Sequence, residues 1–280
     1  MELTSRLKEP KFWLLGIAVA IAAIHLTLVD RIYKEDLFAT SALFWIAAGT
    51  LLWEKRENLK FHSTLPATIA GATLLGLMLL RSSALPTSNF FLCALPFIGL
   101  LGLAFIASGF SGLRQYWREL AIFGFMAFYP LAERILRGLP LPIITAKASN
   151  VMLWYTGTDT RRDGVFLHLS GGRSVEVYEA CSGAQSILQM LCVSVLFLFM
   201  FPLRPIQRVI CIVVAVAIGF FVNAIRVCIM ALLVNQKALF EFWHTGQGSL
   251  LFSVIAVAIF GAFCWFAFLR TPKQTPIKGA

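Results

Sequence analysis

Long apolar runs separated by short polar loops dominate the chain. A membrane-spanning helix needs about 20 mainly apolar residues, and eight runs approach or exceed that length. We therefore predict spans at residues 12–29, 37–53, 65–80, 90–107, 120–139, 183–201, 208–234 and 249–269. Pro140 and Pro142 follow the fifth run, which predicts a kinked or interfacial end. Residues 143–157 fit a short amphipathic helix on the membrane surface.

Composition supports a multi-span membrane protein. Of the 280 residues, 59% are hydrophobic and 14% are charged, against roughly 45–50% and about 25% in soluble chains. A soluble enzyme, a disordered protein and a disulfide-stapled secreted scaffold fit poorly. The first run follows basic residues, as in a signal peptide, but its apolar length up to Val29 favours a retained anchor.

The basic residues are distributed unevenly between alternate loops. One set of loops and both termini hold thirteen: Arg6, Lys8, Lys11, Lys55, Arg56, Lys60, Arg114, Arg118, Arg204, Arg208, Arg270, Lys273 and Lys278. The opposite short loops hold four: Arg31, Lys34, Arg81 and Lys237. The positive-inside rule then places both termini in the cytoplasm and residues 140–182 and 235–248 outside. The same rule accounts for the net charge of +10, so binding of nucleic acid is not needed to explain it.

The long outer segment carries a strand pattern. Residues 165–169 and 174–178 alternate apolar and polar positions around Gly171-Gly172, which predicts a two-stranded hairpin. The predicted fold is thus an all-α polytopic membrane protein of about eight spans, with a small extracytoplasmic hairpin before the sixth span.

Cys181 lies at the edge of the sixth run. Ser182 and Gln185 have capping-box spacing, which predicts that the helix begins there. A thiol at that end lies near the positive end of the helix dipole, which favours the thiolate, and first-turn N–H groups could hold an oxyanion. Gly183 leaves room for a substrate backbone. The alternative is a capped helix start with an incidental cysteine.

Arg226 lies inside the seventh run. Placing its guanidinium in a membrane costs at least ~2.5–3.5 kcal/mol, which favours a functional role, and Asn223 shares its helix face. The alternative is a structural arginine that snorkels to the membrane surface or pairs with Glu179 or Glu241.

His244 precedes the eighth run in a glycine-rich stretch with Phe242 and Trp243. Histidine exchanges a proton near neutral pH; the alternative is an ordinary interfacial histidine.

The predicted topology brings Cys181, Arg226 and His244 to one level near the outer side. A thiol, a cation and a proton carrier are the parts required for acyl transfer through a thioester. The other five cysteines lie inside apolar runs and no Cys/His cluster occurs, so neither a metal nor a cofactor is predicted.

The three motifs together resemble the exosortase/archaeosortase family. They are Glu179-Ala-Cys181-Ser-Gly183 with Gln185-Ser186, then Asn223-x-x-Arg226, then a histidine before the last span, within residues 90–270. The Trp-His-Thr-Gly-x-Gly context is similar to cyanobacterial-type exosortases, and the archaeal branch has Arg where His is found here.

The resemblance implies a cysteine transpeptidase of the inner (plasma) membrane, active on the extracytoplasmic side. Its partners would be membrane lipid and secreted proteins with a C-terminal tripartite signal: a Pro-Glu-Pro-like motif (PEP-CTERM), a transmembrane helix and a basic tail. Cys181 would form the thioester, His244 would be the acid/base group, and Arg226 would stabilise the oxyanion or orient the thiolate. Glu179, Ser182, Gly183 and Asn223 would support them or bind substrate.

The implied organisation is N-terminal transmembrane helices at 1–89, an exosortase-like core at 90–271 and a cytoplasmic tail at 272–280. Two other functions stay open at this point. A transporter would use Arg226 to bind an anionic substrate, but it would usually show repeat symmetry and broken helices. A structural subunit would not depend on Cys181.

Overall fold

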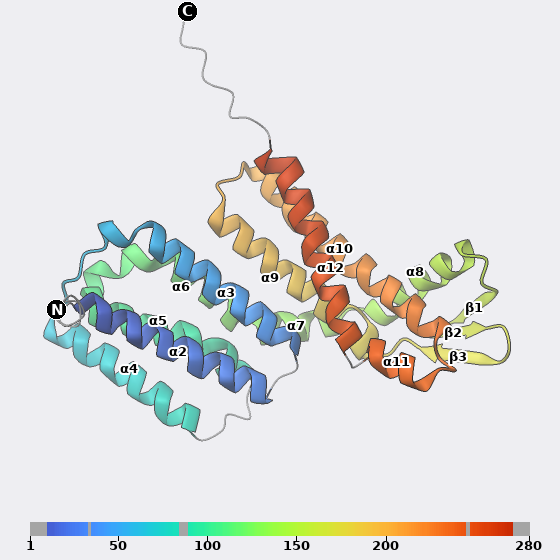
Figure 1. The fold of residues 1–280 in the computed structure, drawn as a ribbon, viewed down its shortest axis with the longest axis horizontal. Helices are drawn as coiled ribbons and strands as arrows, with labels where there is room; N and C mark the ends of the chain where they lie inside the picture. Colours follow the sequence, from blue (N-terminus) through green and yellow to red (C-terminus); the bar gives the residue numbers. More distant parts are fainter. Residues whose placement is uncertain (1–9, 33–34, 84–88, 245–246, 271–280) are drawn as a thin grey trace, which may run out of the picture. The chain divides into compact units, whose positions relative to one another are not determined.

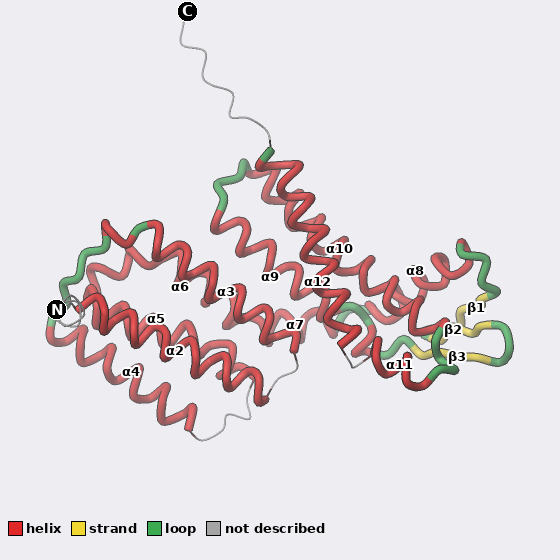
Figure 2. The backbone as a smooth tube through the Cα atoms, in the orientation of Figure 1, coloured by secondary structure: helices red, strands yellow, loops and turns green. Residues whose placement is uncertain are grey.

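The computed structural model describes residues 10–32, 35–83, 89–244 and 247–270, and these form a helical protein with one small sheet (Figures 1 and 2). The predicted tail at 272–280 and the Thr245-Gly246 part of the glycine-rich stretch lie outside the described residues. The chain divides into two compact units, Met1–Ala132 and Glu133–Ala280.

The first unit is helical in its described part. Its helices are α2 (Pro10–Ile32), α3 (Glu35–Glu54), α4 (Leu65–Ser83), α5 (Asn89–Gly112) and α6 (Trp117–Ala127), with short 3₁₀ turns η1 (Arg56–Asn58) and η2 (Leu113–Tyr116). Helices α4 and α5 lie close together, because a Cβ atom on Gly71 would come within 2.4 Å of the Gly102 carbonyl oxygen. Helix α7 (Tyr129–Arg137) leads from this unit into the next.

The second unit contains the sheet and the remaining helices. In chain order these are α8 (Leu141–Tyr155), β1 (Thr160–Asp163), β2 (Phe166–Leu169), β3 (Arg173–Glu176), the 3₁₀ turn η3 (Glu179–Cys181), α9 (Ala184–Met200), α10 (Pro205–Leu232), α11 (Lys237–His244), α12 (Gln247–Cys264) and the π-helical turn η4 (Trp265–Leu269).

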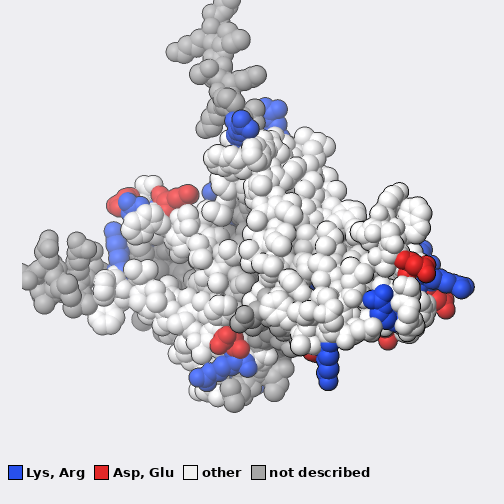
Figure 3. Space-filling model, turned by 45° about the vertical axis from the view of Figure 1, so that its right-hand side comes forward, with Lys and Arg blue, Asp and Glu red and all other residues white. Residues whose placement is uncertain are grey.

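Seven ranges in the described part of the chain are long and apolar enough to cross a membrane: Lys11–Ile32, Leu37–Glu54, Leu65–Ser83, Phe90–Arg137, Glu179–Met200, Pro205–Leu232 and Gly248–Leu269. The chain is therefore a multi-span membrane protein. Charged side chains gather at a few places on the visible face, and most of that face is uncharged (Figure 3).

The fourth predicted span and most of the fifth fall within Phe90–Arg137, and the fifth is not one continuous helix. Helix α6 has 11 residues, or about 16 Å at 1.5 Å per residue, which is too short for a hydrocarbon core of about 30 Å. The break at Phe128 precedes Pro130, which has no backbone N–H to continue the helix of α6.

The outer segment forms three antiparallel strands in the order β1-β2-β3. The predicted hairpin is present as β2 and β3, with Leu167 opposite Val175. Gly171 and Gly172 in the turn both have positive φ, 82° and 74°. Strand β1 was not predicted, because its sequence Thr-Arg-Arg-Asp has no apolar alternation.

Helix α8 matches the predicted helix at 143–157, but it is not simply a surface helix. One of its faces is buried, through Leu141, Thr145, Ala146, Ser149 and Leu153. Its other face exposes Ile144, Val151 and Trp154. Both faces therefore contain apolar residues, and the buried face also contributes two hydroxyl groups.

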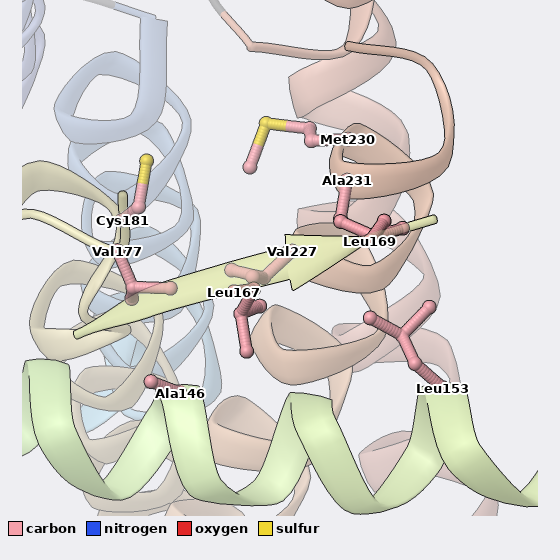
Figure 4. Packing of buried hydrophobic residues seen from close by; sticks show 9 residues of the cluster. All are labelled: Ala146, Leu153, Leu167, Leu169, Val177, Cys181, Val227, Met230 and Ala231. Carbon is pink, nitrogen blue, oxygen red and sulfur yellow. The ribbon is translucent and has the colours of Figure 1, made fainter. Parts of the chain in front are cut away.

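A single apolar cluster holds the sheet against α8 and α10 (Figure 4). Its buried members are Ala146, Leu153, Leu167, Leu169, Val177, Cys181, Val227, Met230 and Ala231. Helices α9 and α10 also pack closely, because a Cβ atom on Gly219 would lie 2.8 Å from the Ser186 carbonyl oxygen. This packing fixes η3, and with it Cys181, beside α10.

Candidate functional site

Cys181 ends the η3 turn and lies three residues before α9. Its side chain belongs to the apolar cluster and is only 5% exposed. The predicted helix start at Ser182 is wrong. Gly183, with φ 88°, occupies the N-cap position of α9, and the Ser182 hydroxyl accepts from the N–H of Ala184, the first residue of the helix. A left-handed residue favours glycine and separates the two helical segments.

The backbone N–H groups around Cys181 are engaged locally. The Cys181 N–H donates to the Tyr178 carbonyl at 2.9 Å and the Ser182 N–H to the Glu179 carbonyl at 3.2 Å. The Ala184 N–H donates to the Ser182 hydroxyl oxygen at 3.3 Å. These three donors are therefore occupied in this conformation, and of them only the Ala184 N–H belongs to the first turn of α9.

Two buried side chains fix the backbone that carries Cys181. Asn223 of α10 donates from Nδ2 to the Cys181 carbonyl at 3.0 Å, and Thr145 of α8 donates to the Ser182 carbonyl at 2.8 Å. A Cβ atom on Gly183 would lie 2.9 Å from Asn223 Nδ2, so glycine is needed for this close approach. The polar side chains satisfy carbonyls that burial would otherwise leave unpaired.

Arg226 contacts the end of α11. Its Nη2 atom donates to the His244 carbonyl at 2.6 Å and its Nε atom to the Trp243 carbonyl at 3.3 Å. Carbonyl groups at a helix C-terminus have no partner within the helix and lie at the negative end of its dipole. The guanidinium therefore satisfies them and holds in place the residue that carries the imidazole.

The imidazole of His244 contacts Tyr178. The Tyr178 hydroxyl oxygen is 2.6 Å from His244 Nε2, and the two rings meet edge to face with centroids 5.9 Å apart. The same hydroxyl interacts with the Cys181 thiol. Tyr178 thus links the two residues that the sequence singled out as thiol and proton carrier.

The ionisation of Tyr178 reflects these neighbours. Partial burial raises the pKa of its hydroxyl above the ordinary value of 10.0, and the Cys181 thiol raises this pKa further. The Arg226 guanidinium lowers the same pKa, whereas Glu241 raises it. The Tyr178 hydroxyl is therefore protonated at neutral pH and can donate a hydrogen bond.

Glu179 lies elsewhere than expected. Its carboxylate is 3.5 Å from Arg137 Nε, and it is exposed, as is the arginine. Glu179 thus faces the end of α7, and its ion pair does not involve Arg226. Exposed pairs of this kind contribute little to stability.

The structure brings Cys181, Arg226 and His244 into one cluster, with Asn223, Ser182 and Gly183 around them. Sequence reasoning did not single out Tyr178 or Thr145. Tyr178 was considered only as a strand residue, although an aromatic hydroxyl three positions before the cysteine was a signal. Thr145 lies in an apolar stretch, where a threonine hydroxyl usually donates to a backbone carbonyl of its own helix.

A scan against protein families matches residues 32–261 to the transmembrane exosortase family (Exosortase_EpsH). No curated protein and no solved structure matches the chain. The match covers most of the sequence and includes Cys181, Arg226 and His244. The chain therefore belongs to the transmembrane exosortase family.

Proposed function

We propose that the protein is a membrane-embedded cysteine transpeptidase that removes the C-terminal sorting signal of secreted proteins. The observation that carries the proposal is that Cys181, Arg226 and His244 come from three separate segments and are linked by side-chain interactions. Tyr178 interacts with both Cys181 and His244, and Arg226 binds a carbonyl group at the end of α11. A thiol that shares a hydroxyl with an imidazole, beside a cation, has the parts of a nucleophilic acyl-transfer site.

In the proposed reaction the Cys181 thiol gives its proton to His244, and the sulfur attacks a peptide carbonyl near a Pro-Glu-Pro-like motif. The C–N bond breaks, a thioester forms, and His244 gives a proton to the departing amine. An acceptor nucleophile then attacks the thioester and passes its proton to the imidazole, the C–S bond breaks, and the imidazolium returns a proton to the sulfur to restore the thiol. Because the Cys181 side chain is only 5% exposed, substrate entry must uncover the sulfur.

The contacts of Arg226 favour a positioning role. Both of its hydrogen bonds described above go to carbonyl groups of α11, so it fixes His244 relative to α10. It also interacts electrostatically with Cys181, which would favour the thiolate over the thiol in the attacking state.

The proposed location is the inner membrane, with both termini in the cytoplasm and the site on the extracytoplasmic side. The uneven distribution of Lys and Arg supports this orientation. The substrates we propose reach that side by secretion, with their own transmembrane helix still in the bilayer.

Co-expression with a secreted reporter that ends in a client sorting signal tests the proposal. The mass of the reporter is compared between wild type, Cys181→Ala and Cys228→Ala. Cys228 is a suitable control because it packs against the same apolar cluster, half-buried. We expect the signal to be removed by wild type and Cys228→Ala and to stay intact with Cys181→Ala.

The mass of the new C-terminus identifies the acceptor as lipid, polysaccharide or water. An intact signal in all strains, with the native client and confirmed expression, would refute the transpeptidase and favour a transporter or structural subunit. Cleavage that persists in Cys181→Ala would refute the role of this thiol.

A further inference from the structure

Tyr178 lies at the centre of the proposed site, yet it is not among the residues that the sequence motifs assign. Its hydroxyl is 2.6 Å from His244 Nε2 and interacts with the Cys181 thiol. The residue is 43% exposed, whereas Cys181 is 5% exposed. The phenol therefore contacts the imidazole and interacts with a buried sulfur.

We propose that the Tyr178 hydroxyl passes the thiol proton of Cys181 to His244, so that His244 activates the nucleophile through Tyr178. This inference rests on the proposed function and deepens it. The Tyr178 oxygen accepts the proton from Sγ while its own proton moves to Nε2. The products are a thiolate, an unchanged tyrosine and an imidazolium, with no net loss of protons.

The surrounding groups are arranged to support this transfer. Arg226 interacts with both the thiol and the phenol and stabilises a negative charge on either. Glu241 of α11 acts electrostatically on the same hydroxyl and opposes that effect. Arg226 also holds the His244 carbonyl, which keeps the ring within reach of the phenol.

The alkylation rate of Cys181 as a function of pH tests the transfer directly. Modification at this residue is followed by peptide mass spectrometry in wild type, Tyr178→Phe and Tyr155→Phe, using a small alkylating reagent. Tyr155 is a matched control because it belongs to the same unit and is 78% exposed. We expect Tyr178→Phe to lower the rate at pH 7 about tenfold, which corresponds to one pH unit in the midpoint.

Cleavage of the reporter should fall about 100-fold in Tyr178→Phe, the scale of lost proton transfer, while Tyr155→Phe stays at the wild-type level. An unchanged alkylation profile in a folded Tyr178→Phe protein would overturn the inference, even if cleavage were lost. If the wild type cleaves no reporter, the proposed function fails, but the alkylation profile still decides whether Tyr178 controls the thiol.

A separate observation concerns Glu119 of α6, in the first unit. Its side chain is 2% exposed, and Oε2 pairs with Lys55 Nζ at 2.8 Å. Oε1 is buried and has no hydrogen-bond partner in the described part of the chain. A buried carboxylate oxygen without a donor is costly, so a donor from outside the chain would stabilise it.

Glu119 and Leu59 line two clefts, which therefore adjoin. One cleft, of about 400 Å³, is polar and is bordered by Glu54, Arg114 and Arg118. The other, of about 430 Å³, is bordered mainly by apolar side chains of α2, α3 and α5. Five Lys or Arg side chains and two carboxylates line the pair of clefts. This combination fits an amphiphile with a phosphate.

We infer that a phospholipid binds here, with its acyl chain in the apolar cleft and its phosphate among the cations. A hydrogen-bond donor of its headgroup reaches Glu119 Oε1. Phosphatidylethanolamine offers an ammonium and phosphatidylglycerol a hydroxyl, whereas phosphatidylcholine has no donor. The lipid thus joins the polar and apolar parts of the first unit.

Native mass spectrometry of the purified full-length protein, titrated with each of the three lipids, tests this site. We expect the wild type to bind the ethanolamine or glycerol lipid about tenfold more tightly than the choline lipid, or 1.4 kcal/mol. Lys55→Met with Glu119→Met removes the ion pair as a unit and should abolish the preference. Glu57→Met, in an exposed pair with Arg56, is the control and should retain it.

Which of the two donor lipids binds more tightly identifies the donor group. Equal affinity for all three lipids in the wild type would overturn the site. A preference that survives in the Lys55→Met/Glu119→Met protein would also overturn it, because the acceptor would lie elsewhere.

Discussion

Replacing Gly183 by alanine should strongly destabilise the second unit. Gly183 has φ 88°, and a non-glycine residue in such a conformation costs about 1–3 kcal/mol. The new Cβ atom would also lie 2.9 Å from Asn223 Nδ2. That side chain must then move and lose its 3.0 Å bond to the Cys181 carbonyl, which costs about 1–3 kcal/mol for buried groups. The sum is about 2–6 kcal/mol.

Gly157→Ala separates the two contributions. Gly157 has φ 80° but nothing lies within 4 Å of its Cβ position, so only the backbone cost of about 1–3 kcal/mol applies. Unfolding free energies are measured by SDS titration of the purified protein, followed by circular dichroism. A third variant, Gly183→Ala with Asn223→Ala, removes the clash and should cost less than the sum of the two single changes.

The reasoning would be refuted if Gly183→Ala and Gly157→Ala cost the same within about 0.5 kcal/mol, or if Gly183→Ala and Asn223→Ala were additive within that margin. Either result would mean that Asn223 does not restrict the space beside Gly183.

Three further outcomes are expected. Gly219→Ala should lower the unfolding free energy by about 1–3 kcal/mol, because the new methyl group meets backbone atoms of α9. Its control, Gly261→Ala, has open space around the new methyl group and should raise the unfolding free energy by up to about 1 kcal/mol in the same titration. Thr145→Val should lower the unfolding free energy by about 1–3 kcal/mol, because it leaves the buried Ser182 carbonyl without its hydrogen-bond donor. A comparable loss of unfolding free energy in Thr50→Val, whose hydrogen bond is exposed, would contradict this account. The tyrosinate absorbance of Tyr178, measured as the difference between wild type and Tyr178→Phe, should have its midpoint above pH 10.0, because the pKa of this hydroxyl is raised. The folded state then keeps a proton that the unfolded chain has lost, so the unfolding free energy falls as pH rises through that midpoint. A midpoint below pH 10.0 would refute this prediction.

Hydropathy and strand alternation were sufficient to predict those helices and strands whose pattern depends only on residues close together in the sequence. The spans at 12–29, 65–80 and 208–234 lie within α2, within α4 and largely within α10. The β2–β3 hairpin followed from alternation around two glycines. These features depend on local free energies, namely transfer of apolar side chains out of water and the backbone freedom of glycine.

Local rules failed where a tertiary contact competed with them. The Ser182 and Gln185 spacing predicted Ser182 as the helix cap, but the left-handed Gly183 next to Asn223 placed the cap one residue later. Strand β1 has no apolar pattern because it forms by pairing with β2, and not by burying a face of its own.

The sequence by itself determined the class of protein and the approximate spans, and it singled out a thiol, a cation and an imidazole as candidate site groups. Only the tertiary structure decided how these groups meet. Tyr178 and His244 are 66 positions apart, and Cys181 and Asn223 are 42 apart. Contacts at such separations have no periodic signature in the chain, because they depend on how α8, α10 and the sheet pack around one apolar cluster.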